Sequence, residues 1–93
     1  MTKVMMNIDR QNNIMFDCVN HADEYDACTI VSTLCNVLVE AADRADCEPT
    51  IYNPGHVRLD ISKAQNDTLE IFETVMTVMK QAADQHPEFI KIY

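Results

Sequence analysis

The segment TKVMMNIDRQNNIMFDCV, residues 2–19, contains the pattern that decides the fold. On either side of its central polar stretch, apolar side chains alternate with mostly polar ones, and a period of two residues is typical of a strand with one buried face. The inward positions are Val4, Met6 and Ile8 before the polar stretch, and Ile14, Phe16 and Cys18 after it. The sequence therefore predicts that the chain opens with an antiparallel hairpin that turns at Arg10-Gln11-Asn12-Asn13.

A helical period begins at Ala27 and continues to about Ala45. Its apolar residues recur at spacings of three and four, which is typical of a helix packed against a core. They are Ile30, Leu34, Val37, Leu38 and Ala41, flanked by Val31, Cys35 and Val39. Asp26 is the expected N-cap, because its carboxylate can accept hydrogen bonds from the unpaired amides of the first turn.

A second hairpin and a second helix are predicted in the rest of the chain. The strands are residues 50–52 and 57–61, which turn at Asn53-Pro54-Gly55. The helix begins near Asp67, which has capping-box spacing to Glu70, and ends before Pro87. Its apolar stripe is Leu69, Phe72, Met76, Met79 and Ala83. Residues 89–93 suit a last strand.

The element order ββαββαβ indicates an α+β protein. We expect a two-layer sandwich in which two helices pack on a mostly antiparallel sheet of about five strands. The 93 residues should form one domain over positions 1–93. A chain of this length builds a thin core, so we expect it to form a homodimer.

The charge of the chain limits its partners. Fifteen acidic residues against seven basic ones give a net charge of -8, which disfavours binding to nucleic acid or to an anionic membrane surface and favours a basic protein partner. No apolar run approaches the roughly 20 residues of a membrane span. The N-terminal residues do not form a signal-peptide core, so we expect a cytoplasmic protein.

The cysteines and histidines show no metal-ligand spacing, and we expect neither a metal nor a cofactor. The four cysteines form no CxxC pair and are predicted to be free thiols. Cys18 and Cys35 fit inward positions and are predicted to be core residues. Cys47 receives no role. His56, at a turn, and His86, at a helix end, are expected at the surface.

The segment NHADEYDACTIVS, residues 20–32, places His21 at a strand end and Cys28 at a helix start. A helix N-terminus stabilises a thiolate, an imidazole can accept the thiol proton, and the amides of the first turn can bind an oxyanion. The same residues also suit a small buried thiol beside an unrelated histidine. The three carboxylates between them either raise the thiol pKa or orient the histidine as a third triad member.

Two parts of this segment, together with the end of the chain, carry a family resemblance. His21-Ala22 and Cys28-Thr29-Ile30-Val31-Ser32 match the strand end and helix start of the ribosomal-processing cysteine protease family, Prp. The closing Gln85-His86-Pro87-Glu88-Phe89-Ile90-Lys91-Ile92 is similar to the family's last Tyr-Pro-Glu-Tyr-hydrophobic run. The chain resembles this family over nearly its whole length.

The resemblance implies a cysteine endopeptidase that removes a short hydrophobic N-terminal extension from a large-subunit ribosomal protein in bacteria. It implies His21 as the general base and Cys28 as the nucleophile. Ser32 would support the helix start from one turn along, and Asp26 would cap the helix or orient the dyad. The partner implied is a protein or peptide substrate, and a basic ribosomal protein fits the acidic surface.

Three departures from the family pattern support alternative functions. Asn20 replaces a glycine before the histidine, although Asn tolerates positive φ better than most residues. The loop to Cys28 is shorter than is usual and lacks glycine, and Tyr25 stands where the family has Asp. The alternatives are a non-catalytic binding or regulatory module of the same fold, and a phage-type paralogue that processes another protein.

Overall fold

The computed structural model describes residues 1–93 and contains five strands and two helices in the predicted order. They are β1 (Thr2–Ile8), β2 (Ile14–Val19), α1 (Tyr25–Arg44), β3 (Ile51–Asn53), β4 (His56–Ile61), α2 (Asn66–Gln85) and β5 (Ile90–Ile92). The predicted α+β class is therefore confirmed. Neither helix combines the length and the hydropathy that a bilayer-spanning segment requires.

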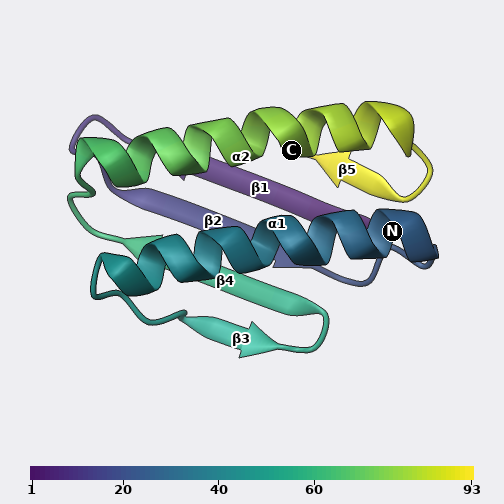
Figure 1. The fold of residues 1–93 in the computed structure, drawn as a ribbon, viewed down its shortest axis with the longest axis horizontal. Coiled ribbons are helices and arrows are strands. Elements are labelled where there is room, and N and C mark those ends of the chain that lie inside the picture. The colour runs from purple at the N-terminus through teal and green to yellow at the C-terminus, as the bar shows by residue number, and fades with distance from the viewer.

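The strands form one sheet in the order β3-β4-β2-β1-β5. The pairs β1/β2, β2/β4 and β3/β4 are antiparallel, and β1/β5 is parallel. This agrees with the predicted mostly antiparallel sheet. The two helices lie side by side on one face of the sheet and run in opposite directions (Figure 1). The start of α1 and the turn between β3 and β4 lie at the same end of the molecule, which positions the site described below.

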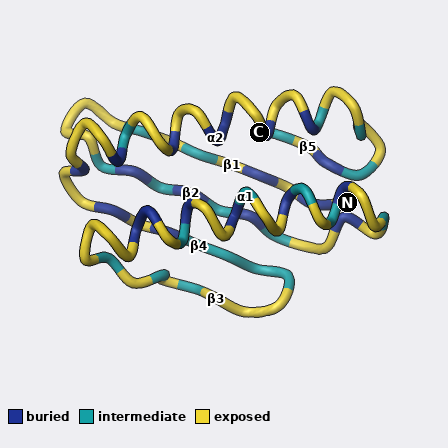
Figure 2. The backbone as a smooth tube through the Cα atoms, viewed as in Figure 1, coloured by how far each residue is buried: buried dark blue, intermediate teal, exposed yellow.

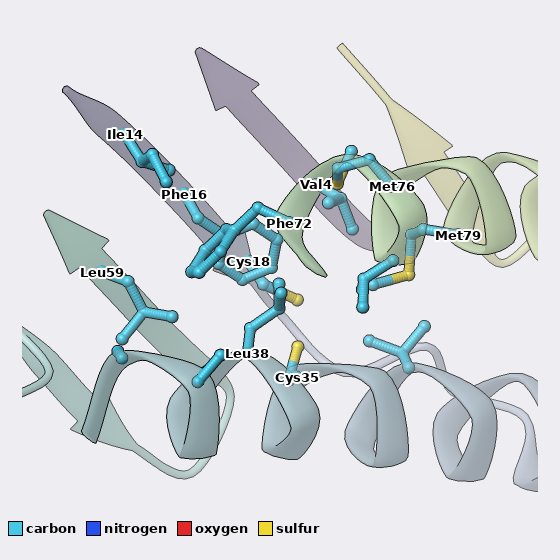
Figure 3. Packing of buried hydrophobic residues seen from close by; sticks show 14 of the residues in the cluster. Val4, Ile14, Phe16, Cys18, Cys35, Leu38, Leu59, Phe72, Met76 and Met79 are labelled. Atoms are coloured by element: carbon cyan, nitrogen blue, oxygen red, sulfur yellow. The ribbon is translucent and has the colours of Figure 1, made fainter. Parts of the chain in front are cut away.

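The core lies between the sheet and the helix layer, and the buried side chains follow the periods seen in the sequence (Figure 2). On β2, Ile14, Phe16 and Cys18 are buried and the intervening residues are only half-buried. Phe16 and Phe72 are fully buried between the layers, beside Leu38 of α1 (Figure 3). Alternation on the strands therefore predicted the inner face of the sheet correctly.

The N-cap predicted for α1 is wrong. The cap is Glu24, whose carboxylate accepts hydrogen bonds from the amides of Asp26 and Ala27, while Asp26 is the second helical residue and is exposed. Asp23 has a φ of 63°, which turns the chain so that the extended Glu24 directly precedes the helix. The stretch contains three carboxylates, those of Asp23, Glu24 and Asp26. The backbone turn at Asp23 determines that Glu24 is the one that caps the helix.

The inner face of α1 is also rotated from the predicted stripe. Val37, placed on that stripe, is 43% exposed. The buried residues are Ala27, Val31, Cys35, Leu38, Ala41 and Ala42. Apolar residues occupy most faces of this helix, so the period alone did not fix which line faces the sheet.

The predicted capping box of α2 is absent. The N-cap is Gln65, which makes no side-chain hydrogen bond to the helix, and the Asp67 carboxylate accepts instead from the Thr68 amide at 2.9 Å. Phe72, Met76 and Met79 are buried as predicted. The helix ends as expected before Pro87, with His86 as its C-cap.

Candidate active site

The connection from β2 to α1 is fixed by contacts with two other parts of the chain. Asn20 has a φ of 72°, the left-handed conformation that asparagine tolerates better than most residues. Its amide donates to the carbonyl oxygen of Gly55 at 2.7 Å, and its own carbonyl accepts from the Thr2 hydroxyl at 2.5 Å. Ala22 is 1% exposed and anchors the loop in the core. The backbone on both sides of His21 is therefore held in place.

The imidazole of His21 lies on the turn between β3 and β4. A β-carbon at Gly55 would come 3.1 Å from Nε2 of His21, which is closer than ordinary van der Waals contact. Gly55 itself has a φ of 81°, a conformation that favours glycine. The only glycine of the chain thus shapes the turn and leaves room for the ring.

The carboxylate of Glu24 binds the backbone amides of the first turn of α1. The Glu24 carboxylate accepts from the amide of Ala27 at 2.8 Å and from that of Asp26 at 3.2 Å, and these two bonds lower the pKa of Glu24. The amide of Cys28 donates to the Glu24 carbonyl at 2.8 Å. On the other side, Nδ1 of His86 lies 3.9 Å from the Glu24 carboxylate. The first-turn amides expected to bind an oxyanion are therefore already paired in this structure.

Cys28 and His21 line one cavity of about 300 Å³. Cys28 is half-buried in the first turns of α1, and no hydrogen bond joins its sulfur to the imidazole. Ser32, one turn further along α1, lines the same cavity. Asp26 does not line it and points to solvent. The structure thus brings together three of the four residues selected from the sequence.

The opposite wall of the cavity is the β3–β4 hairpin, to which sequence reasoning gave no role at the site. Tyr52, Pro54, Gly55 and Val57 line the cavity from this side. The Tyr52 hydroxyl donates to Oδ1 of Asn36 on α1 at 3.4 Å, so the hairpin and the helix are joined. The turn signal Asn53-Pro54-Gly55 located the hairpin, but no local pattern indicates which helix it faces.

The floor of the cavity is part of the core. Cys18 of β2 and Cys35 of α1 are 6% and 5% exposed, and their sulfur atoms point toward each other between the layers (Figure 3). Both also line the cavity. The hydrogen bond with the Cys18 thiol, and then burial, raise the pKa of Cys35. The prediction that both thiols are core residues is confirmed.

The remaining cysteine and histidines lie as follows. All four cysteines are free, as predicted. Cys47 is half-buried, and desolvation raises its pKa. His56 is less exposed than expected, because its Nε2 lies 2.7 Å from the Asp17 carboxylate in a half-buried pair. No cluster of three His, Cys, Asp or Glu side chains has the geometry to hold a metal ion.

The fold of the chain matches that of known protein structures. No protein-family model and no curated protein sequence matches the chain. Among solved structures, the essential ribosomal processing protease Prp from S. aureus, determined with a covalently linked product peptide, matches with a TM-score of 0.81 and 18% identity over 99% of this chain and 97% of its own. The chain has the Prp fold.

A second structure supports the same conclusion. The protein SMU.848 from Streptococcus mutans matches with a TM-score of 0.77 and 26% identity, over 99% of this chain and 91% of its own. The resemblance to Prp that His21-Ala22 and residues 28–32 carry in the sequence is thereby confirmed at the level of the fold.

Proposed function

We propose that the protein is a cysteine endopeptidase in which Cys28 is the nucleophile and His21 the general base. The observation that carries this proposal is that a thiol in the first turn of α1 and an imidazole line one cavity. Helix N-termini and nearby imidazoles both favour the reactive thiolate. The Prp fold adds support, since Prp is a ribosomal processing protease that was captured with a covalently linked product peptide.

The proposed reaction needs only these two side chains and water. His21 accepts the thiol proton of Cys28, and the thiolate attacks a peptide carbonyl carbon. The C–N bond then breaks, the leaving amine takes the proton from the imidazolium, and a thioester remains on Cys28. Water adds to the thioester, the C–S bond breaks, and the free acid and the thiol are released. Ser32, one turn along α1, supports the site from the cavity wall.

The substrate we propose is a basic protein with a short hydrophobic N-terminal extension, such as a large-subunit ribosomal protein precursor. The net charge of -8 attracts a basic polypeptide. Asp23 and Asp26, both exposed beside the start of α1, place part of that charge near the cavity. We also propose that residues 1–93 form a single domain and that the protein acts as a homodimer in the bacterial cytoplasm. Sedimentation equilibrium at several protein concentrations tests whether it dimerises.

The test is cleavage of candidate precursors, read by mass spectrometry. We expect wild type to release the N-terminal extension, and Cys28→Ser and His21→Ala to lose this activity. His86→Ala, which changes a histidine outside the cavity, should retain it. Absence of cleavage of every ribosomal precursor would reject that substrate class.

A thiol-labelling experiment tests the dyad without a substrate. At neutral pH, iodoacetamide should label Cys28 first and Cys35 last, because Cys35 is buried and its pKa is raised. His21→Ala should slow the labelling of Cys28. Equal and slow rates for Cys28 and Cys35 would contradict a catalytic thiol.

A non-catalytic peptide-binding module of the same fold is the second candidate. Two observations favour it: no hydrogen bond joins Cys28 to His21, and Glu24 occupies the amides of Asp26 and Ala27. Peptide binding by both wild type and Cys28→Ser, without cleavage by either, would support this candidate. A phage-type paralogue that processes another protein would instead cut a non-ribosomal precursor through the same Cys28.

A further inference from the structure

The end of the molecule remote from Cys28 contains another cavity, of about 330 Å³, that the proposed reaction does not use. It lies where α1 ends and α2 begins, two helix ends that are side by side in Figure 1. Arg44, the last residue of α1, follows Cys28 by roughly 24 Å along the helix axis. A ligand in this cavity would therefore be bound separately from the Cys28–His21 site.

The connection from β4 to α2, residues 62–65, forms one wall of this cavity and is fixed to the turn between β1 and β2. The Lys63 amide donates to Oδ1 of Asn13 at 2.9 Å, and the Ala64 amide donates to the carbonyl oxygen of Asn12 at 2.8 Å. Ala64 is also buried, at 8% exposure. This wall is thus held in place before any ligand binds.

The start of α2 leaves backbone donors free at the same wall. Gln65, the N-cap, makes no side-chain hydrogen bond to the helix, and the amides of Asn66 and Asp67 have no partner. The Leu69 amide is the first to bond within the turn, to the carbonyl oxygen of Gln65 at 3.0 Å. Unpaired amides at a helix N-terminus attract anions.

Thr68, in the first turn of α2, is an independent indication of a ligand. It lines the cavity and is only 7% exposed, yet its hydroxyl makes no hydrogen bond. Every side-chain polar atom that is fully enclosed in the protein has a partner, so the Thr68 hydroxyl must open into the cavity. A largely buried hydroxyl without a partner is costly, and a ligand that accepts a hydrogen bond would pair it.

Two cations line the same cavity, Arg44 from α1 and Lys63 from the connection. Neither forms an ion pair, although the chain has fifteen acidic residues and only seven basic ones. Asp46 and Asp67 also line the cavity, and the Asp67 carboxylate accepts from the Thr68 amide at 2.9 Å. The two carboxylates reduce the attraction for an anion, but neither is in contact with a cation.

We propose that this cavity binds a phosphate group through the free amides of α2, the Thr68 hydroxyl and the side chains of Arg44 and Lys63. All of these groups donate hydrogen bonds, and those from cations to phosphate are especially strong. The volume of about 330 Å³ lies within the range of ligand pockets, so a small phosphate ester fits as well as inorganic phosphate. Ile61 and Ile71 line the cavity beside the donors and suit an apolar ester group.

The test is an NMR titration of the isotope-labelled protein with inorganic phosphate and with phenyl phosphate, at an ionic strength held constant with sodium chloride. Both probes should shift the amide signals of Asn66, Asp67 and Thr68. Tighter binding of phenyl phosphate would assign the site to a phosphate ester, and equal binding would assign it to the free ion. Unchanged signals at these three amides with both probes would overturn the inference.

Matched variants test the individual donors. Arg44→Gln and Lys63→Gln should each weaken binding by about two- to fivefold, whereas Lys80→Gln, which removes an exposed lysine further along α2, should leave it unchanged. Thr68→Val should weaken binding by about threefold without loss of stability in phosphate-free buffer, because its hydroxyl is unpaired there. Thr77→Val removes an exposed hydroxyl of the same helix and should not change phosphate binding.

Asp67→Asn should have the opposite effect. It keeps an oxygen for the Thr68 amide and removes a negative charge from the cavity, so phosphate should bind about two- to fivefold more tightly. Equal affinities for wild type, Lys63→Gln and Asp67→Asn would overturn the inference. None of these measurements involves Cys28, so their failure would leave the proposed function standing, and absence of protease activity would leave the phosphate site standing.

Discussion

The imidazole of His21 rests against the backbone of Gly55, with so little space between them that a β-carbon at position 55 would lie 3.1 Å from Nε2 and 3.4 Å from Cδ2. The two residues come from distant parts of the chain. The hydrogen bond from the Asn20 amide to the Gly55 carbonyl fixes their approach. The β3–β4 turn thus determines where the proposed general base lies.

Substitution of Gly55 should displace His21 whatever it does to stability. The φ of 81° makes Gly55→Ala strained, and we expect a loss of about 1–2 kcal/mol in the free energy of unfolding. Gly55→Asn should lose less, because Asn tolerates this conformation. Both variants add the β-carbon, so both should shift the NMR signal of the His21 Cε1 proton and slow Cys28 alkylation. An unshifted His21 signal in both variants would show that the turn does not position the ring.

Asn20 offers a second test of the backbone near the site. Its φ of 72° should make Asn20→Gly compatible with the fold, whereas Asn20→Ala should lose about 1 kcal/mol. Urea denaturation of the two variants measures the difference. Equal stabilities would contradict the left-handed conformation at this position.

Alanine variants of Glu24 and Asp26 test which of the two carboxylates caps α1. Glu24→Ala removes the acceptor of two amides and should lower the melting temperature more than Asp26→Ala does. The pKa of Glu24 is lowered by these amides, so its contribution to stability is present above its ordinary value of 4.5 and disappears as the pH falls through the lowered pKa.

Thermal unfolding of both variants and wild type at neutral and acid pH checks this assignment. The difference between wild type and Glu24→Ala should be largest at neutral pH and should shrink in acid. A larger loss for Asp26→Ala would restore the cap expected from the sequence.

Two neighbouring residues of α1 test which face of the helix packs against the sheet. Leu38 is fully buried and Val37 is 43% exposed. Leu38→Ala should therefore lose about 2–5 kcal/mol in the free energy of unfolding, and Val37→Ala no more than about 0.5 kcal/mol. Chemical denaturation of both variants gives these values, and similar losses would mean that the inner face of α1 is assigned wrongly.

The order of elements and the inner face of the strands were predictable because they depend on local periods. Phe16 and Cys18 alternate with half-buried residues on β2, and such alternation is typical only of a strand with one buried face. The face of α1 was not predictable in the same way, since apolar residues surround it. The caps depend on backbone turns such as the positive φ of Asp23, a conformation that aspartate tolerates but that the sequence does not assign to one of several neighbouring acidic residues.

The candidate site was predictable only in part. The sequence placed His21 at a strand end and Cys28 at a helix start, and the structure has both on one cavity. It did not indicate that Tyr52 and Gly55 complete this cavity, because these contacts join segments far apart along the chain. Nor did it indicate that Glu24 would bind the first amides of α1, since that depends on the turn at Asp23.

Cys18 and Cys35 belong at once to the packed interior and to the surface that a ligand would touch. Replacing either one to accommodate a different ligand would also alter the volume that holds α1 against the sheet. Tyr52 and Asn36, both exposed, carry no such constraint. Evolution, or a directed library, would therefore explore new specificities most freely at the rim, while the interior thiols would change slowly and only with compensating replacements.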